Sequence, residues 1–308
     1  MITLSVILPA YNSHDTLAGC LEALARQTFR DFETIVVDSS PVETAWRAER
    51  IAAEPPPDLP GFRFVRSAHR LLPHAARNRG VEIARGELLV FTDPDIYPRP
   101  DWLERLLAAH RETGGPVVGA LACHGAGWAD QGYHLCKFSK WLPGGRPREV
   151  DMSPTGNMLL ARGQFEAAGG FPSGNFLGDV TLSRNLRRQG HRLWFEPRAV
   201  VEHHHLQSLP AFLGERATRG RIYGHLRLGW SRKGRAAALG WLAVTALPVR
   251  LARILTLVGL HAVRAGQTRR YLATLPLVAA GHAASLAGEA SAYARAAIRR
   301  HPIRDPAC

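Results

Sequence analysis

Two aspartates, Asp93 and Asp95, directly follow the apolar run Leu88-Leu89-Val90-Phe91. A strand that ends on two carboxylates presents hard oxygen ligands at the edge of a sheet, and Mg²⁺ and Mn²⁺ prefer such ligands. A cation held there would neutralise a bound diphosphate. The alternative is a capped turn before a helix that begins at Asp101. The triplet therefore predicts a metal site only if further polar groups reach the same edge.

A run of three histidines, His203-His204-His205, offers further ligands. Neighbouring residues on a strand point to opposite faces, so at most His203 and His205 share a side. A neutral imidazole nitrogen suits Mn²⁺. Chemistry alone does not separate His203 from His205, and two surface histidines after a strand are the alternative interpretation.

Strands alternate with helices through the first 110 residues, which predicts an α/β fold with a mostly parallel central sheet and helices on both faces. Ligands bind at the carboxyl ends of the strands in such sheets. Asn12, Asp38 and Asp93 each follow the end of a predicted strand, so we expect them to meet at one rim. The predicted strands are Leu4 to Leu8, Phe32 to Val37, Phe62 to Val65 and Glu87 to Thr92, and the predicted helices include Val42 to Ala53, His74 to Ala84 and Asp101 to His110.

Several motifs, taken in order, resemble family 2 glycosyltransferases over about residues 3 to 205. The resemblance implies a GT-A fold, a UDP- or GDP-sugar donor bound by residues 1–98 and an acceptor bound by residues 99–208. Residues 209–308 lie beyond the resemblance, and their own composition predicts a helical, membrane-associated region. The motifs are Val6-Ile7-Leu8-Pro9-Ala10-Tyr11-Asn12, Ile35-Val36-Val37-Asp38, Ala76-Arg77-Asn78-Arg79-Gly80, Phe91-Thr92-Asp93-Pro94-Asp95, Gly156-Asn157-Met158, Ala168-Gly169-Gly170-Phe171, Asp179 to Leu186 and Pro197 to His203.

The resemblance also implies which residues bind the nucleotide. Pro9, Ala10, Tyr11 and Asn12 would line its pocket, and Asp38 would hydrogen-bond the base. The chain has Ser39-Ser40 after Asp38 where the family often has a second acid and Gly-Ser, so the contact to the ribose is expected to differ.

Four further residues are assigned to the phosphates and the metal by the same resemblance. Arg77 would lie near the phosphates, where a guanidinium offers paired donors. Its alternative role is a surface charge on a helix. Asp95 and His203 would hold Mn²⁺ or Mg²⁺, and Asp93 would face the ribose or a second metal oxygen.

Asp179 corresponds to the catalytic base of the family, which takes the proton of the acceptor hydroxyl in a single inverting displacement. Gly156 and Asn157 fall in the matched segment assigned to the acceptor. The family usually has Glu-Asp where this chain has Gly178-Asp179. The alternative role of Asp179 is to cap the amphipathic helix that it opens.

The positive charge of the chain is concentrated in its last third. The formal net charge is +13, and residues 1–210 contain 23 basic and 23 acidic residues, whereas residues 211–308 contain 16 and 3. The same region holds an uncharged stretch of 18 residues, 271–288. Basic and apolar residues in one segment favour an anionic membrane surface over nucleic acid. The alternative is a biased composition, because only three of the 39 basic residues are lysines.

Arginines flank the apolar stretches of this tail on every side, including Arg264, Arg269 and Arg270 between two of them. A two-pass hairpin would place these three outside, against the positive-inside rule. We therefore expect helices that lie in the cytoplasmic interface of the membrane, with a membrane hairpin and a soluble helical subdomain as alternatives. The N-terminal residues show no secretory signal pattern, and the four cysteines lack CxxC spacing, so a reducing compartment is expected.

Together these observations predict a metal-dependent inverting glycosyltransferase of cell envelope polysaccharide biosynthesis, with a lipid-linked or membrane-proximal glycan acceptor. A catalytically silent nucleotide-sugar-binding scaffold is the alternative. A dehydrogenase is disfavoured, because no GxGxxG follows the first strand. The Gln-x-x-Arg-Trp motif of the processive synthases is absent from the sequence, which favours transfer of one sugar per encounter.

Overall fold

The computed structural model describes residues 2–172, 177–205, 207–231, 235–246 and 248–298. The chain divides into two compact units, which we call the sheet unit and the helical unit. The segment Cys123–Leu142 belongs to the helical unit, although the sequence places it within the 99–208 acceptor half. The sheet unit comprises Met1–Ala122, Pro143–Gly174 and Gly178–His204, and the helical unit comprises Cys123–Leu142, Asn175–Leu177 and His205–Cys308.

Nine strands within the described residues form one mixed sheet. They are β1 (Leu4–Ala10), β2 (Phe32–Asp38), β3 (Arg63–Arg66), β4 (Leu88–Phe91), β5 (Ile96–Pro98), β6 (Val117–Cys123), β7 (Arg148–Val150), β8 (Met158–Ala161) and β9 (Leu193–His203). Their order is β3-β2-β1-β4-β8-β6-β9-β5, with β7 beside β9. The predicted parallel arrangement is confirmed for β3, β2, β1 and β4. Antiparallel pairing begins at β8, which pairs with both β4 and β6.

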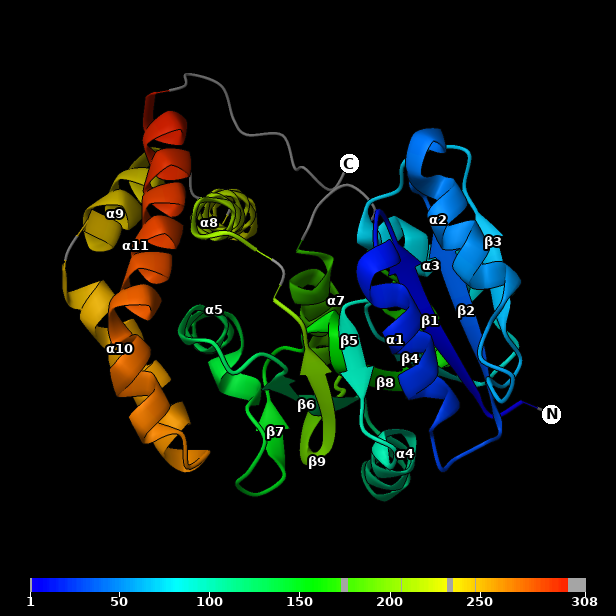
Figure 1. The fold of residues 1–308 in the computed structure, drawn as a ribbon. Helices are drawn as coiled ribbons and strands as arrows, with labels where there is room; N and C mark the ends of the chain where they lie inside the picture. Colours follow the sequence, from blue (N-terminus) through cyan, green and yellow to red (C-terminus); the bar gives the residue numbers. More distant parts are fainter. Residues whose placement is uncertain (1, 173–176, 206, 232–234, 247, 299–308) are drawn as a thin grey trace. The chain divides into compact units, whose positions relative to one another are not determined.

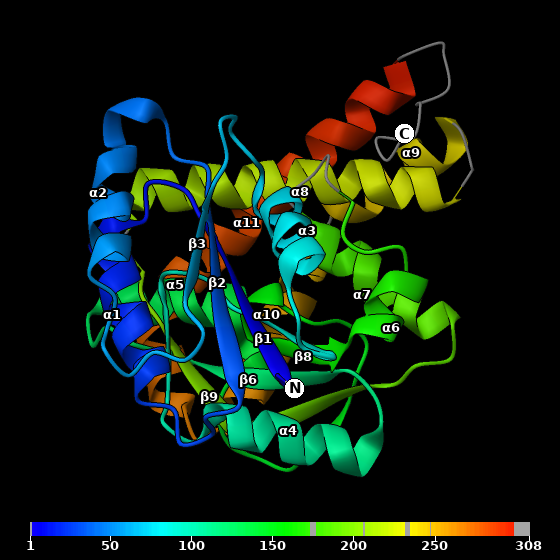
Figure 2. The ribbon, with the colours of Figure 1, turned by 90° about the vertical axis from the view of Figure 1, so that its right-hand side faces the viewer.

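The parallel half is the core of the sheet unit, because every residue of β1 and β2 is buried. Strands covered on both faces are rich in apolar residues, and the few polar side chains of these two are buried as well, with Ser5 Oγ donating to Glu33 Oε1 over 2.7 Å. Helices α1 and α2 lie on one side of β1 and β2, and α3 lies on the other (Figure 2). The helices of this unit are α1 (His14–Ala25), α2 (Val42–Ala53), α3 (Pro73–Ile83), α4 (Trp102–Thr113), α6 (Arg162–Ala167) and α7 (Gly178–Arg188), and the short 3₁₀ turn η2 covers Thr155–Asn157.

Two strand pairings bring together polar residues that the sequence analysis singles out. The parallel register pairs Ala10 of β1 with Asp38 of β2, so the polar residues after both strands lie at one level. The antiparallel register of β5 with β9 pairs Ile96 with His203. This second pairing brings the residue that follows the acidic triplet beside the histidine run.

The helical unit is built around α11, which packs closely on α8. A Cβ added at Gly220 of α8 would lie 2.0 Å from the carbonyl oxygen of Ser285, and one at Gly288 of α11 would lie 2.0 Å from that of Ala217. Glycine is needed at both positions because the two backbones nearly touch. The elements of this unit are α5 (Trp128–Phe138), the 3₁₀ turn η1 (Ser139–Trp141), α8 (Leu209–Ser231), α9 (Arg235–Ala246), α10 (Pro248–Arg264) and α11 (Thr268–Ile298), as shown in Figure 1.

Candidate active site

The ends of β1 and β2 are joined by side-chain hydrogen bonds. The backbone N–H of Asn12 donates to Ser40 Oγ over 2.8 Å, and Ser40 Oγ donates to Asp38 Oδ1 over 2.6 Å. Asn12 has a φ of 51°, in the left-handed region that asparagine tolerates better than most residues. Two of the three residues predicted at one rim, Asn12 and Asp38, are therefore joined through Ser40.

Asp38 is fully buried and accepts three hydrogen bonds within the protein. Two come from Ser40, and the third comes from Arg66 Nη1 at 3.1 Å. An ionised carboxylate offers about four acceptor sites, so about one remains for a ligand. The predicted contact of Asp38 with a base therefore stays a prediction. The sequence did not identify Ser40 and Arg66 as its partners, since nothing local connects Arg66 to a residue 28 positions earlier.

Arg77 lies on the inner side of α3 and forms an ion pair with Asp93. The residue is only 3% exposed, so the alternative of a surface helix charge is wrong. Burial and the charge of Asp95 raise the pKa of Asp93, although the cation of Arg77 acts in the opposite direction. Arg77 thus fixes one carboxylate of the triplet in place.

Asp95, the other carboxylate, lies beside the first histidine of the run. His203 Nε2 is 3.8 Å from Asp95 Oδ2. The backbone N–H of His204 donates to the carbonyl oxygen of Asp95 over 2.8 Å, and the His204 ring lies 4.0 Å from that of Tyr97. His205 instead approaches His134 of the helical unit. The structure therefore separates His203 from His205, which the sequence could not do.

These side chains fit Mn²⁺ or Mg²⁺. Two carboxylates and an imidazole nitrogen are suitable donors for such cations. Burial, together with the charges of Asp95 and Asp93, raises the pKa of the thiol of Cys20, which donates to the carbonyl oxygen of Asp93 over 3.6 Å. A cation beside Asp95 and His203 would be stabilised by the charges that disfavour a thiolate at Cys20.

A buried histidine connects the acidic triplet to the start of α7. His74 lies one turn before Arg77 on α3, and its Nδ1 is 3.4 Å from Arg77 Nη1. Its ring stacks on Phe171, with centroids 4.8 Å apart. A Cβ built on Gly178 would lie 2.6 Å from Cδ2 of His74. Contacts thus lead from Asp93 through Arg77 and His74 to the residue before Asp179.

The same contact explains why the chain departs from the Glu-Asp pattern at Gly178. The His74 imidazole fills the space that a Cβ would need, so a glutamate at 178 would force the stacked ring to move. Asp179 itself lies in the first turn of α7, and its Oδ1 accepts from the N–H of Val180 over 2.9 Å. Sequence reasoning missed His74, although it falls beside the Arg77 motif with helical spacing.

Gly156 and Asn157 have different surroundings. The Asn157 amide is buried and bonds to Trp102 Nε1 and to the carbonyl oxygens of Ala120 and Ala199, at 2.8 to 3.1 Å. These bonds give it a structural role between strands, and its predicted contact with an acceptor stays a prediction. Gly156 lies against the acidic triplet instead, because an added Cβ would be 2.9 Å from Asp93 Oδ2.

Gly156→Ala is therefore expected to disturb the triplet. The added methyl would also lie 2.5 Å from Cδ1 of Ile96, so both neighbours must move. We expect a loss of about 1–3 kcal/mol in the free energy of unfolding, measured in urea, together with a weaker thermal shift with Mn²⁺ and UDP. The control is Gly163→Ala on α6, where a Cβ meets nothing within 4 Å and Ala should stabilise by about 0.5–1 kcal/mol. Equal stability changes in both variants would contradict the packing described here.

Comparison with known proteins gives relatives that are glycosyltransferases. The chain is 28% identical over 199 residues to "Glycosyltransferase AglE" of Haloferax volcanii, a match that covers 62% of this chain and 63% of that protein. It is 32% identical over 107 residues to "Amylovoran biosynthesis glycosyltransferase AmsB" of Erwinia amylovora, covering 35% of each chain. The matches thus span less than two thirds of both relatives.

Solved structures share the fold. The mannosyltransferase PcManGT from Pyrobaculum calidifontis, in complex with GDP-Man and Mn²⁺, gives a TM-score of 0.58 at 20% identity, covering 89% of this chain and 86% of that one. Residues 1–349 of S. aureus TarS, in complex with UDP-GlcNAc, give a TM-score of 0.52 at 20% identity, covering 67% of this chain and 59% of that one. The expected GT-A fold is confirmed by these likenesses.

The family model described as "Glycosyl transferase family 2" matches residues 5–168. That range contains β1 to β4, the acidic triplet, Arg77 and Gly156. It covers more than half of the 308 residues. The chain therefore belongs to glycosyl transferase family 2.

Proposed function

We propose that the chain transfers a sugar from a nucleoside diphosphate sugar to an acceptor hydroxyl, in a metal-dependent reaction that inverts the anomeric centre. The observation that carries this proposal is the contact series from Asp93 through Arg77 and His74 to Gly178. It connects the proposed phosphate and metal end of the site to the helix that begins beside the proposed base, Asp179. The rim residues Asn12 and Asp38 complete the nucleotide side.

Each residue then has a defined task. Asp95 and His203 would hold Mn²⁺ or Mg²⁺, which when bound supplies positive charge beside the diphosphate leaving group. Arg77, fixed by Asp93, adds a guanidinium beside the phosphates. Asp179 takes the proton from the acceptor hydroxyl as that oxygen attacks the anomeric carbon and the sugar–phosphate bond breaks. Attack opposite the leaving group inverts the configuration.

The donor class is inferred from the same edge of the sheet and from the solved neighbours. PcManGT was determined with GDP-Man and Mn²⁺, and TarS with UDP-GlcNAc. The test is a panel of UDP- and GDP-sugars incubated with the protein, Mn²⁺ and a membrane extract. We expect nucleoside diphosphate release from one of these donors that depends on the extract. No release with any donor, in a folded preparation, would contradict the proposed activity.

A catalytically silent donor-binding scaffold is the second candidate. It is favoured by Gly178, which replaces the usual acid, and by Asp38, whose carboxylate is largely occupied by Ser40 and Arg66. Tight binding of a donor in the thermal-shift assay without release of a nucleoside diphosphate would support the scaffold. Release would exclude it.

We infer that the helical unit binds the cytoplasmic face of a membrane through α10. One side of this helix packs Val258 and Ala262 into the core of the unit. The opposite side is apolar but exposed, with side chains of 44% to 69% relative accessibility. Exposed Arg253 and Arg264 lie on that side by helical spacing, which suits the headgroups of anionic lipids. The exposed apolar residues are Val249, Leu257, Leu260 and Val263.

A cluster of charges favours this surface arrangement over a membrane hairpin. Within the described residues, α11 has the length and apolar composition of a membrane span. It also carries the buried Glu289, which bonds to Arg250 of α10 at 2.7 Å and to Arg227 of α8 at 3.5 Å. Such a paired cluster holds three helices together and is costly within a bilayer. A membrane-bound enzyme would then act on a lipid-linked or membrane-proximal acceptor, in keeping with the amylovoran biosynthesis named for AmsB.

The double variant Leu260→Glu, Val263→Glu should therefore bind anionic vesicles at least about tenfold more weakly than wild type, because two apolar contacts are replaced by like-charged groups. Co-sedimentation with phosphatidylglycerol vesicles at moderate salt measures this. The matched control is Val42→Glu, Trp46→Glu, which changes two exposed apolar residues of α2 in the sheet unit. Resistance of wild-type binding to high salt and carbonate washing would reject peripheral binding in favour of the hairpin.

A further inference from the structure

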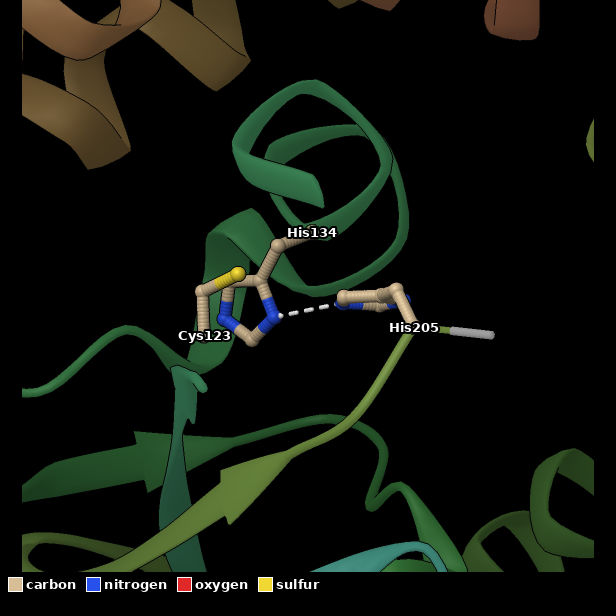
Figure 3. A group of neighbouring side chains, drawn as sticks. All are labelled: Cys123, His134 and His205. Carbon is tan, nitrogen blue, oxygen red and sulfur yellow. Dashed lines mark hydrogen bonds between the residues drawn. The ribbon is translucent and has the colours of Figure 1, made fainter. Parts of the chain in front are cut away.

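Three side chains with metal-binding atoms come together in the helical unit (Figure 3). Cys123, His134 and His205 each offer one ligand atom, and these atoms lie within 4.8 Å of one another. Cys123 ends β6, His134 lies on α5, and His205 follows the end of β9. The three are distant in sequence, and neither the family resemblance nor the proposed reaction gives any of them a role.

The geometry of the cluster is close to that of a tetrahedral zinc site. His134 Nδ1 and His205 Nε2 are 3.1 Å apart. Zinc–nitrogen bonds of about 2.0–2.1 Å at tetrahedral angles place two nitrogens about 3.3 Å apart, and a thiolate lies about 3.6 Å from each. All three ligand atoms lie within 4.8 Å of one another, so no separation has to shorten by more than about 1 Å. A turn of the Cys123 side chain away from the carbonyl oxygen of Gly125, which its thiol contacts at 3.2 Å, supplies such a movement.

The surroundings favour a borderline metal ion over Mg²⁺ or Mn²⁺. His134 is buried, and the ring of Phe138 lies 5.3 Å from the His134 ring and 6.1 Å from the His205 ring. A thiolate and two imidazole nitrogens match Zn²⁺ or Co²⁺, whereas Mg²⁺ and Mn²⁺ prefer oxygen ligands. The cluster therefore differs in ligand chemistry from the carboxylate site at Asp95 and His203.

The position of the cluster along the chain indicates what a metal would do there. Cys123 and His205 are the first residues of the helical unit after Ala122 and His204, where the chain leaves the sheet unit. His134 lies in the middle of α5. A metal bound by all three would fix both entering segments to α5.

We propose that Cys123, His134 and His205 bind one Zn²⁺ ion, with water as the fourth ligand, and that the ion stabilises the start of the helical unit. The histidine run then serves two sites, with His203 at the catalytic cation and His205 at the zinc. One residue, His204, lies between the two ligands, and β9 ends at His203.

The test uses the full chain without a polyhistidine tag, freed of metal by a chelator and then titrated with Co²⁺. Bound Co²⁺ should give the thiolate-to-metal charge-transfer absorption, with an amplitude that corresponds to one thiolate-bound ion per chain. Zn²⁺ should displace Co²⁺ and raise the midpoint of thermal unfolding by about 5 °C at a hundredfold excess over its Kd. A wild-type protein that shows no thiolate absorption with Co²⁺ would overturn the proposal.

Variants assign the ligands. Cys123→Ser should abolish the thiolate absorption and weaken Co²⁺ binding at least about tenfold, because the thiolate is the strongest donor of the three. Cys136→Ala removes the buried thiol of α5 and should retain the absorption. His203→Asn, at the proposed catalytic cation site, should also retain it. Persistence of the thiolate absorption in Cys123→Ser would exclude this cluster as the site.

Discussion

Asp179→Asn is expected to lower kcat for sugar transfer by about 10²–10⁴-fold while donor affinity changes less than about twofold. The amide has nearly the size of the carboxylate but takes up no proton from an acceptor hydroxyl. Asp179 lies in the first turn of α7, beyond Gly178 and its contact with His74. The proposed base therefore lies on a helix whose start packs against His74, which in turn contacts Arg77.

The same substitution distinguishes catalysis from helix capping. Asn and Asp stabilise helix starts almost equally, so a purely structural Asp179 would tolerate Asn with little change in activity or unfolding free energy. The matched control is Asp101→Asn, which changes an exposed aspartate at the start of α4 in the same unit. Initial rates at saturating donor, with donor binding measured separately, distinguish a catalytic Asp179 from one that only caps the helix. Unchanged kcat in Asp179→Asn would remove the base from the proposed mechanism.

The parallel half of the sheet could be predicted from the sequence because its strands carry the strongest local signals. Leu4 to Leu8 and Phe32 to Val37 are mainly apolar, and β1 and β2 begin at the same residues and extend to Ala10 and Asp38. The antiparallel half gives weaker signals. Strands such as β5 and β7 have three residues each, and their pairing with β9 depends on contacts across more than 40 positions.

The site could be predicted only where a side chain follows a strong element. Asn12, Asp38 and Asp93 were expected at one rim because each follows a strand, and the structure joins the first two through Ser40. The partners Arg66 and His74 were not found, because they are ordinary residues until the fold buries them. The choice between His203 and His205 likewise depends on the register of β5 with β9, which no local pattern determines.

The sequence also does not show that the segment 123–142 belongs to the helical unit. The sequence pattern becomes irregular after the predicted helix Asp101 to His110, so the segment is placed with its neighbours in the chain. In the structure α5 packs on α11, and Gly132 accommodates the side chain of Leu277. Such a contact joins residues 145 positions apart. Local sequence patterns predict α4 before this segment and α7 after it, but not the unit to which the segment belongs.

Asp95→Asn is expected to remove the response to Mn²⁺ without unfolding the protein. Asp95 is 39% exposed, so its loss leaves no buried charge unpaired. Asp93→Asn is the instructive contrast, because it would leave the buried guanidinium of Arg77 without its carboxylate. We therefore expect Asp93→Asn to destabilise the fold by about 3–5 kcal/mol, and Asp95→Asn to change the free energy of unfolding by less than about 0.5 kcal/mol.

Asp95→Asn, which is expected to leave stability nearly unchanged, should nevertheless lower activity strongly. A carboxylate that supplies a metal ligand contributes several kcal/mol through the cation, so Asp95→Asn should lower transfer by about 10²–10⁴-fold. The decisive measurement is thermal unfolding with UDP, with and without Mn²⁺: wild type should show a Mn²⁺-dependent rise, and Asp95→Asn should show none. Asp101→Asn again serves as the exposed control and should keep the full rise. A Mn²⁺-dependent rise in Asp95→Asn equal to that of wild type would mean that the cation is held elsewhere, because His203 alone cannot replace the carboxylate that lies 3.8 Å from its Nε2.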